Sequence, residues 1–206
     1  MNKYTNNNPK YENIARTIIN RLGQKSISLP RISDDKRLRG YPGLAGTASN
    51  ISKYIPNCYT YVEPLAGTAK VYQELLISPQ YTILNDKSEF VVSWLKKEFP
   101  NVTVNNMDFI DCILKYDNYN TFFLIDAPWH RSFYDKSYSC FDRKDVKTYD
   151  EEILDICRTL KGKFIICSDR SNTRMLSSGF HNRLITGVYK IAGGYTKTLL
   201  TSNILL

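Results

Sequence analysis

The chain has 206 residues, 42% of them hydrophobic, which is enough to bury the core of one domain. Its formal net charge of +8 and pI near 9.2 favour a polyanionic partner, most simply a nucleic acid. Its apolar runs are far too short to cross a membrane, and its first residues lack the apolar core of a secretory signal. We therefore expect an intracellular, cytoplasmic protein.

The two histidines and five cysteines give no metal-ligand spacing and no Cys-x-x-Cys pair. We expect reduced, packed thiols and no metal site. The positive charge is concentrated near the C-terminus, where the stretch from Arg158 to Leu206 holds eight Lys or Arg and one acid, Asp169. This stretch would suit a nucleic acid, although a solvated cationic face without a partner would have the same composition.

Hydrophobic periodicity predicts that helices and strands alternate along the chain. Thr47 or Ser49 is expected to cap the second helix, and Asp150 the last one. Helices are predicted at residues 11–22, 47–55, 71–76, 88–99, 109–115 and 151–160. Strands are predicted at residues 59–62, 81–84, 102–105, 122–125, 164–167, 184–191 and 196–204. This order predicts an α/β fold whose sheet is mostly parallel, with antiparallel C-terminal strands.

The chain is expected to divide into two parts. Residues 1–36 hold one helix and a basic loop, which we expect to be partly flexible, and residues 37–206 form a single domain.

A small-residue loop, Glu63 to Ala69, lies between a predicted strand and a predicted helix. Its small residues would let the backbone approach a ligand, and the helix start would present N–H groups. Asp86 ends the next strand, nineteen positions after Gly67, where an acid suits hydrogen bonding to a ribose. The single glycine and the acidic Glu63 argue against a pyrophosphate over the loop. A nucleoside without phosphates, such as S-adenosylmethionine, fits better.

The strand at residues 122–125 ends in Asp126, Ala127, Pro128 and Trp129. Groups at the carboxyl end of a strand face the ligand crevice of an open α/β sheet. The Asp126 carboxylate and the carbonyl before the proline could accept both N–H groups of an exocyclic amine, and Trp129 could stack on the ring. The alternative is a buried strand followed by an ordinary proline turn.

The loop from His130 to Lys147 mixes basic and aromatic residues. This composition suits an everted base in a strand of nucleic acid, because cations contact phosphate and rings stack on bases. A lid packed by its own aromatic rings is the alternative. The predicted nucleic-acid-binding residues are Arg131, Lys136, Arg143, Lys144 and, after the next strand, Arg170.

Four blocks, in order, resemble the Dam-type (D12 class) DNA adenine N6-methyltransferases. They are Leu38–Gly43, Tyr61–Gly67, Leu84–Asp86 and Asp126–Trp129, and a weaker match at Leu199–Asn203 resembles the family's closing strand. The Glu-Pro-Leu-Ala-Gly loop followed about sixty residues later by Asp-Ala-Pro-Trp is the most specific part. The resemblance spans roughly residues 37 to 203.

The resemblance implies a Rossmann-like, S-adenosylmethionine-dependent methyltransferase fold and methyl transfer to the N6 amine of adenine in DNA. It implies a cofactor site made by Tyr41, Pro42, Gly43, Glu63, Pro64, Leu65, Ala66, Gly67, Asn85, Asp86, Asp108 and Phe109. In this assignment Asp108 accepts the cofactor's adenine amine and Phe109 packs on its ring. Asp108 could also be the N-cap of the following helix.

Three departures from the family pattern affect this assignment. Ala45 stands where the family usually has a lysine for the cofactor's carboxylate, and Ala127 stands in place of the first proline of the catalytic tetrapeptide. Only 39 residues (87–125) separate Asp86 from Asp126, so we expect little or no target-recognition insert there. Methylation of cytosine N4 or of RNA adenine, and a non-catalytic nucleic-acid-binding module, therefore stay open as alternatives.

Overall fold

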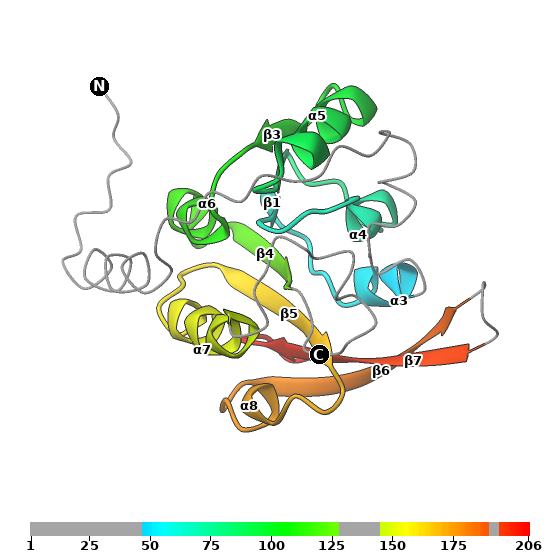
Figure 1. Cartoon of the computed structure of the whole chain (residues 1–206), viewed down its shortest axis with the longest axis vertical. Coiled ribbons are helices and arrows are strands. Elements are labelled where there is room, and N and C mark those ends of the chain that lie inside the picture. The colour runs from blue at the N-terminus through cyan, green and yellow to red at the C-terminus, as the bar shows by residue number, and fades with distance from the viewer. Residues whose placement is uncertain (1–46, 128–144, 190–193) are drawn as a thin grey trace.

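The computed structural model describes residues 47–127, 145–189 and 194–206, so the helix predicted at residues 11–22 lies outside the described part. A seven-stranded sheet with the order β3-β2-β1-β4-β5-β7-β6 runs through the molecule (Figure 1). The strands are β1 (Thr60–Glu63), β2 (Tyr81–Asn85), β3 (Thr103–Asn105), β4 (Thr121–Asp126), β5 (Lys163–Asp169), β6 (His181–Tyr189) and β7 (Gly194–Ser202).

The first five strands are parallel to one another. β7 then pairs antiparallel to β5, and β6 antiparallel to β7. The predicted class is confirmed: the fold is α/β, with a mostly parallel sheet that ends in antiparallel C-terminal strands. The strand order reverses at β1, since β2 lies on one side of it and β4 on the other. In such sheets ligands bind outside the carboxyl ends of the strands at this reversal.

Helices cover both faces of the sheet. They are α3 (Ala48–Ser52), α4 (Lys70–Gln73), α5 (Glu89–Glu98), α6 (Phe109–Tyr116), α7 (Asp145–Cys157) and α8 (Thr173–Leu176). The apolar sides of α6 and α7, with Met175 of α8, pack on the face that carries Val62, Phe123 and Ile166. α3 and α4 pack on the opposite face, against Tyr61 and its neighbours.

The central strands are buried on both faces, which explains their near-continuous apolar sequence. Phe122, Phe123 and Ile125 are each 0% exposed, although consecutive residues point to opposite faces. The register pairs Val62 with both Ile83 and Phe123. The ends of β2, β1 and β4 are thereby held side by side.

Two local predictions are wrong, and one short helix was missed. Asp150 is not a helix cap: α7 begins at Asp145, and Asp150 is buried within it, where its Oδ2 accepts from Asn172 Nδ2 at 3.0 Å. The helix predicted to reach Leu76 ends at Gln73, and Leu76 is 71% exposed. The four-residue α8 was not predicted, because it has too few residues to show a periodic pattern.

Candidate cofactor and active site

The loop after β1 turns sharply beside the end of β2. Gly67 and Ala69 have positive φ angles of 50° and 49°, which glycine adopts without penalty and alanine at a cost of about 1–2 kcal/mol. The Ala66 N–H donates to the Asn85 carbonyl at 2.7 Å, and the Gly67 N–H donates to Asp86 Oδ2 at 3.0 Å. The end of β2 therefore fixes the backbone of this loop.

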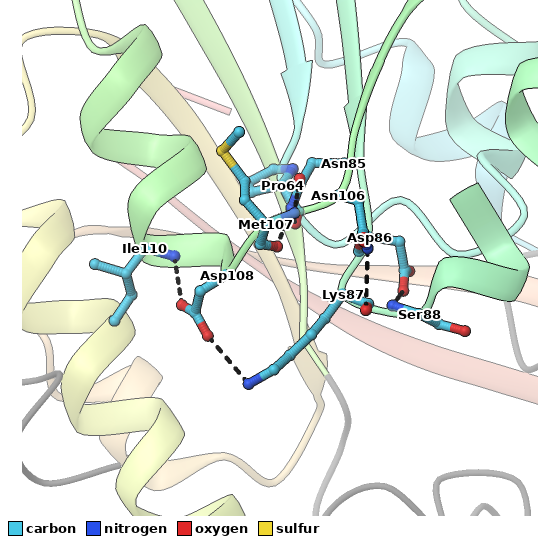
Figure 2. Close-up of polar contacts among 9 residues, drawn as sticks. All are labelled: Pro64, Asn85, Asp86, Lys87, Ser88, Asn106, Met107, Asp108 and Ile110. Atoms are coloured by element: carbon cyan, nitrogen blue, oxygen red, sulfur yellow. Dashed lines mark hydrogen bonds and ion pairs between the residues drawn. The ribbon is translucent and has the colours of Figure 1, made fainter. Parts of the chain in front are cut away.

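The Asn85 side chain connects the ends of three strands. Its Nδ2 donates to the carbonyls of Pro64 at 2.8 Å and Met107 at 3.0 Å, and its Oδ1 accepts from the Met107 N–H at 3.1 Å (Figure 2). The residue is fully buried. Asn85 thus organises the site from within the protein, and its contact with a cofactor stays a prediction.

The Asp86 carboxylate accepts two backbone N–H groups, one from Gly67 and one from Ser88 at 2.8 Å. Burial raises the pKa of this carboxyl, and its hydrogen bonds with the backbone, those from Ser88 and Gly67 first, act in the opposite direction. Each carboxylate oxygen can accept more than one hydrogen bond, so a ribose hydroxyl could still be bound. The ribose role of Asp86 stays a prediction.

Glu63, the last residue of β1, is buried beneath the loop. Its Oε1 accepts from the Tyr61 hydroxyl at 2.6 Å and from the Tyr72 N–H of α4 at 2.9 Å. Burial raises the pKa of the Glu63 carboxyl to about 8; these hydrogen bonds lower it, and the nearby charge of Asp126 raises it further. Glu63 is therefore mostly protonated at neutral pH. The repulsion of a pyrophosphate that we expected from its charge is correspondingly reduced.

Asp126 ends β4, the strand next to β1. The two strands are parallel and Val62 pairs with Phe123. Glu63 and Asp126 follow this pair by one and three residues, so both lie toward the same edge of the sheet. The charges of Asp126 and Glu63 both raise the pKa of the buried Cys167 thiol, after burial itself. Asp126 and the buried Ala127 thus flank the Glu63–Gly67 loop, whereas Pro128 and Trp129 lie outside the described residues.

Asp108 is the N-cap of α6, as the alternative for this residue predicted. Its Oδ1 accepts from the Ile110 N–H at 3.0 Å, and its Oδ2 lies 3.5 Å from Lys87 Nζ (Figure 2). Phe109 is 3% exposed and belongs to the core between the sheet and α6 and α7. The predicted stacking of Phe109 on an adenine ring stays a prediction.

Of the predicted nucleic-acid-binding residues, only Arg170 lies in the described part of the chain. It is exposed and directly follows the carboxyl end of β5, on the edge that also carries Asp126. The others, Arg131, Lys136, Arg143 and Lys144, lie outside it, as do Tyr41, Pro42, Gly43 and Ala45.

Sequence reasoning placed Tyr61 in the cofactor-loop block but did not identify the contacts of Tyr61, Tyr72 and Lys87. Tyr61 and Glu63 are two positions apart on one strand and therefore share a face, which is a signal that could have found their contact. The Tyr72 and Lys87 contacts each join two different elements, and no local pattern predicts them.

In residues 47–127, 145–189 and 194–206, no helix is long and apolar enough to cross a membrane. The same residues contain no cluster of three or more His, Cys, Asp or Glu side chains suited to a metal ion.

Comparisons with known proteins identify the fold. No family model and no curated protein matches the chain. Among solved structures, it is similar to SMU.472, a putative methyltransferase complexed with SAH, with a TM-score of 0.56 and 12% identity over 78% of this chain and 52% of that one. It is also similar to the MT0146 product of Methanobacterium thermoautotrophicum, described as precorrin 8W decarboxylase, with a TM-score of 0.50 and 16% identity over 81% and 95% of the two chains. The chain thus spans about half the length of SMU.472, and it has the Rossmann-like methyltransferase fold.

Proposed function

We propose that this protein is an S-adenosylmethionine-dependent methyltransferase that modifies the exocyclic N6 amine of adenine in DNA. One observation carries the proposal. On a methyltransferase fold, the Glu63–Gly67 loop, Asp86, Asp108 and Asp126 occupy the carboxyl ends of β1, β2, β3 and β4, which are neighbours in the sheet. These are the residues that resemble the cofactor and catalytic blocks of the adenine methyltransferases.

The cofactor half of the site would lie over β1, β2 and β3. Asp86, held by the N–H groups of Gly67 and Ser88, would accept the ribose hydroxyls. Asp108, held by its cap on α6, would accept the adenine amine. Both carboxylates are fixed before any ligand arrives, which reduces the ordering cost of binding.

The catalytic half would lie at the end of β4. Asp126 and the Ala127 carbonyl would each accept an N–H of the target amine, and this favours a pyramidal nitrogen whose lone pair faces the methyl group. Bound S-adenosylmethionine would supply an electrophilic methyl group, and its sulfur would keep the electron pair of the broken carbon–sulfur bond as the nitrogen takes the methyl. The nitrogen would then lose one proton to solvent, which leaves N6-methyladenine. Alignment of the two bound reactants would lower the activation barrier by on the order of 7–11 kcal/mol.

The target nucleic acid would approach along this edge of the sheet. Arg170, which is exposed and follows β5, is the residue of the described edge that we assign to contact with this nucleic acid. A duplex adenine must leave its stack to reach Asp126, at a cost of a few kcal/mol.

RNA is the second candidate target. Residues 87–125, where the family usually inserts its recognition domain, form α5, β3 and α6 of the sheet domain itself. Without an insert, the chain would lack the usual means of reading duplex sequence, and this favours single-stranded or structured RNA as a substrate.

The test combines transfer and binding measurements. Wild-type protein is incubated with labelled S-adenosylmethionine and a mixture of DNA and RNA, and the nucleosides are analysed by mass spectrometry. We expect N6-methyldeoxyadenosine. Asp126→Ala should lower the transfer rate at least about 100-fold, while calorimetric affinity for S-adenosylhomocysteine stays near that of the wild type.

Asp155→Ala is the matched control, because Asp155 is an exposed acid of α7 that pairs with Arg158 at 2.8 Å. It should keep full activity. Methyl transfer by Asp126→Ala at the wild-type rate would refute the role of Asp126. Label on cytosine or on RNA would correct the target, and nucleic-acid binding without cofactor binding would favour the non-catalytic module.

A further inference from the structure

An ion pair connects the ends of β2 and β3 at the edge of the candidate cofactor site. Lys87 follows Asp86 directly after β2, and its Nζ lies 3.5 Å from Asp108 Oδ2, at the start of α6 (Figure 2). The Lys87 side chain is 73% exposed and that of Asp108 24%. The pair is therefore open to a ligand on one side and held by the protein on the other.

The two groups offer different hydrogen-bonding capacities side by side. Asp108 Oδ1 is already used by the Ile110 N–H, so Oδ2 is the oxygen that faces Lys87. Lys87 Nζ has three donors and no acceptor, and the carboxylate has acceptors only. An acceptor and a donor thus lie close enough to face two neighbouring atoms of one ring edge.

Adenine presents the complementary pattern. Its exocyclic amine donates, and the ring nitrogens on either side of the amine, N1 and N7, accept. A purine with a carbonyl in place of the amine presents the reverse order at N1. The pattern of Asp108 and Lys87 therefore matches the amine of adenine together with either one of these two ring nitrogens.

We propose that Lys87 is a specificity-determining residue of the cofactor site: Asp108 accepts the amine of the cofactor's adenine, and Lys87 donates to the ring nitrogen next to that amine. This assignment rests on the proposed function. It is supported by the chain order, because Lys87 follows the residue proposed to hold the ribose, so the base and the sugar of one nucleoside would meet adjacent residues.

Insertion of the base between the two groups requires little energy. Ion pairs as exposed as this one contribute little to stability, since water screens them. Lys87 also faces a second acid: its charge lowers the pKa of Asp111, which burial and the charge of Asp108 raise. The lysine can therefore move toward the base without leaving the electrostatic field of these two acids.

The test is a double-mutant-type cycle in which calorimetry measures the affinities of the wild type and a Lys87 variant for a parent ligand and its analogues. Lys87→Met removes the charge and keeps most of the aliphatic stem, and Lys97→Met, at an exposed position in the last turn of α5, removes the same charge elsewhere. Lys87→Met should weaken binding of S-adenosylhomocysteine about tenfold, the loss expected for a hydrogen bond to a charged group. Lys97→Met should leave the affinity within a factor of about two.

The 1-deaza and 7-deaza analogues of S-adenosylhomocysteine each lack one of the two ring nitrogens. The wild type should bind one of these analogues about tenfold more weakly than the parent ligand, and Lys87→Met should bind that analogue and the parent equally. If Lys87→Met keeps the wild-type affinity, or still binds the analogue that the wild type disfavours more weakly than the parent ligand, the proposal is wrong. Absence of binding to the wild type itself would instead refute the proposed function.

Discussion

Glu63 illustrates how a single buried carboxyl shapes this site. It connects β1 to α4 through Tyr72, and it lies on the strand next to that of Asp126. Two carboxyls in such an environment resist double ionisation. The charge of Asp126 accordingly helps to keep Glu63 protonated.

We predict a pH dependence of stability that comes from Glu63. Its pKa is about 8 in the folded protein and near the ordinary 4.5 in the unfolded chain, so the folded state binds more protons between these values. Stability should therefore fall as pH rises from about 4.5 to 8, by up to about 1.4 kcal/mol per pH unit.

Glu63→Gln should remove this dependence, because the amide keeps an acceptor for Tyr61 and Tyr72 and does not titrate. Urea unfolding of both proteins at pH 5, 7 and 9 measures it. The wild type should lose stability relative to Glu63→Gln between pH 5 and 8. Parallel curves for the two proteins would show that Glu63 does not titrate in this range.

At the scale of single residues, the sequence predicts positions along a strand but not contacts between strands. The loop, Asp86 and Asp126 could be placed at strand ends because each follows an apolar run, and parallel strands bring such ends to one edge. The hydrogen bonds of Asp86 to Gly67 and of Asn85 to Met107 could not be predicted, since they depend on the orientation of side chains across different strands. These side-chain orientations decide whether a carboxylate binds the protein backbone or faces a ligand.

The turn that leads into β5 is tightly packed against the start of β4. Asp117 accepts from the N–H groups of Lys161 and Gly162, at 3.0 Å and 2.9 Å from its Oδ1. A Cβ at Gly162 would lie 2.8 Å from the Thr121 carbonyl oxygen and 3.0 Å from the Phe123 ring. This turn and the start of β4 therefore allow no side chain at residue 162.

Gly162→Ala should accordingly destabilise the protein by about 1–3 kcal/mol, the usual cost of overpacking. Lys163→Ala, at an exposed side chain one residue later, should change stability by less than about 0.5 kcal/mol. Thermal and denaturant unfolding measure both. Equal stability of the two variants would mean that the turn relaxes around the added methyl group.

Element boundaries were predictable where a cap coincides with a long apolar pattern. α5 and α6 begin directly after Ser88 and Asp108, whose side chains accept from the backbone within the first turn. Asp150 has the same cap chemistry but lies inside α7, because the helix continues upstream to Asp145. A capping residue predicts a helix start only where the preceding residues are not themselves helical.

For the molecule as a whole, the charge of +8 predicts a salt-dependent interaction with nucleic acid. Two phosphate contacts already imply a loss of affinity of about tenfold between 50 and 200 mM salt. Fluorescence anisotropy with a labelled single strand and a duplex of the same sequence would measure it. Affinity independent of salt would show that the positive charge is a solvated face.

The overall architecture was the most predictable feature, because strand and helix periods alternate along the chain and the late paired strands are long. The hydrophobic periodicity of the strands and helices does not predict whether the substrate is DNA or RNA. That choice depends on the surface beside Asp126, where Arg170 is the one predicted nucleic-acid-binding residue that lies in the described part of the chain.

Asp86 and Asp108 each serve the scaffold and, in our proposal, the ligand, and this shared duty limits how the site can evolve. A substitution of Asp86 that changed the ligand preference would also remove the hydrogen bond that holds the loop after β1. A substitution of Asp108 would likewise remove the cap of α6. The Lys87 side chain is 73% exposed and its ammonium forms an ion pair with the Asp108 carboxylate, so it can be replaced with little loss of structure. New nucleoside preferences should therefore arise first at residue 87, by natural drift or in a directed library.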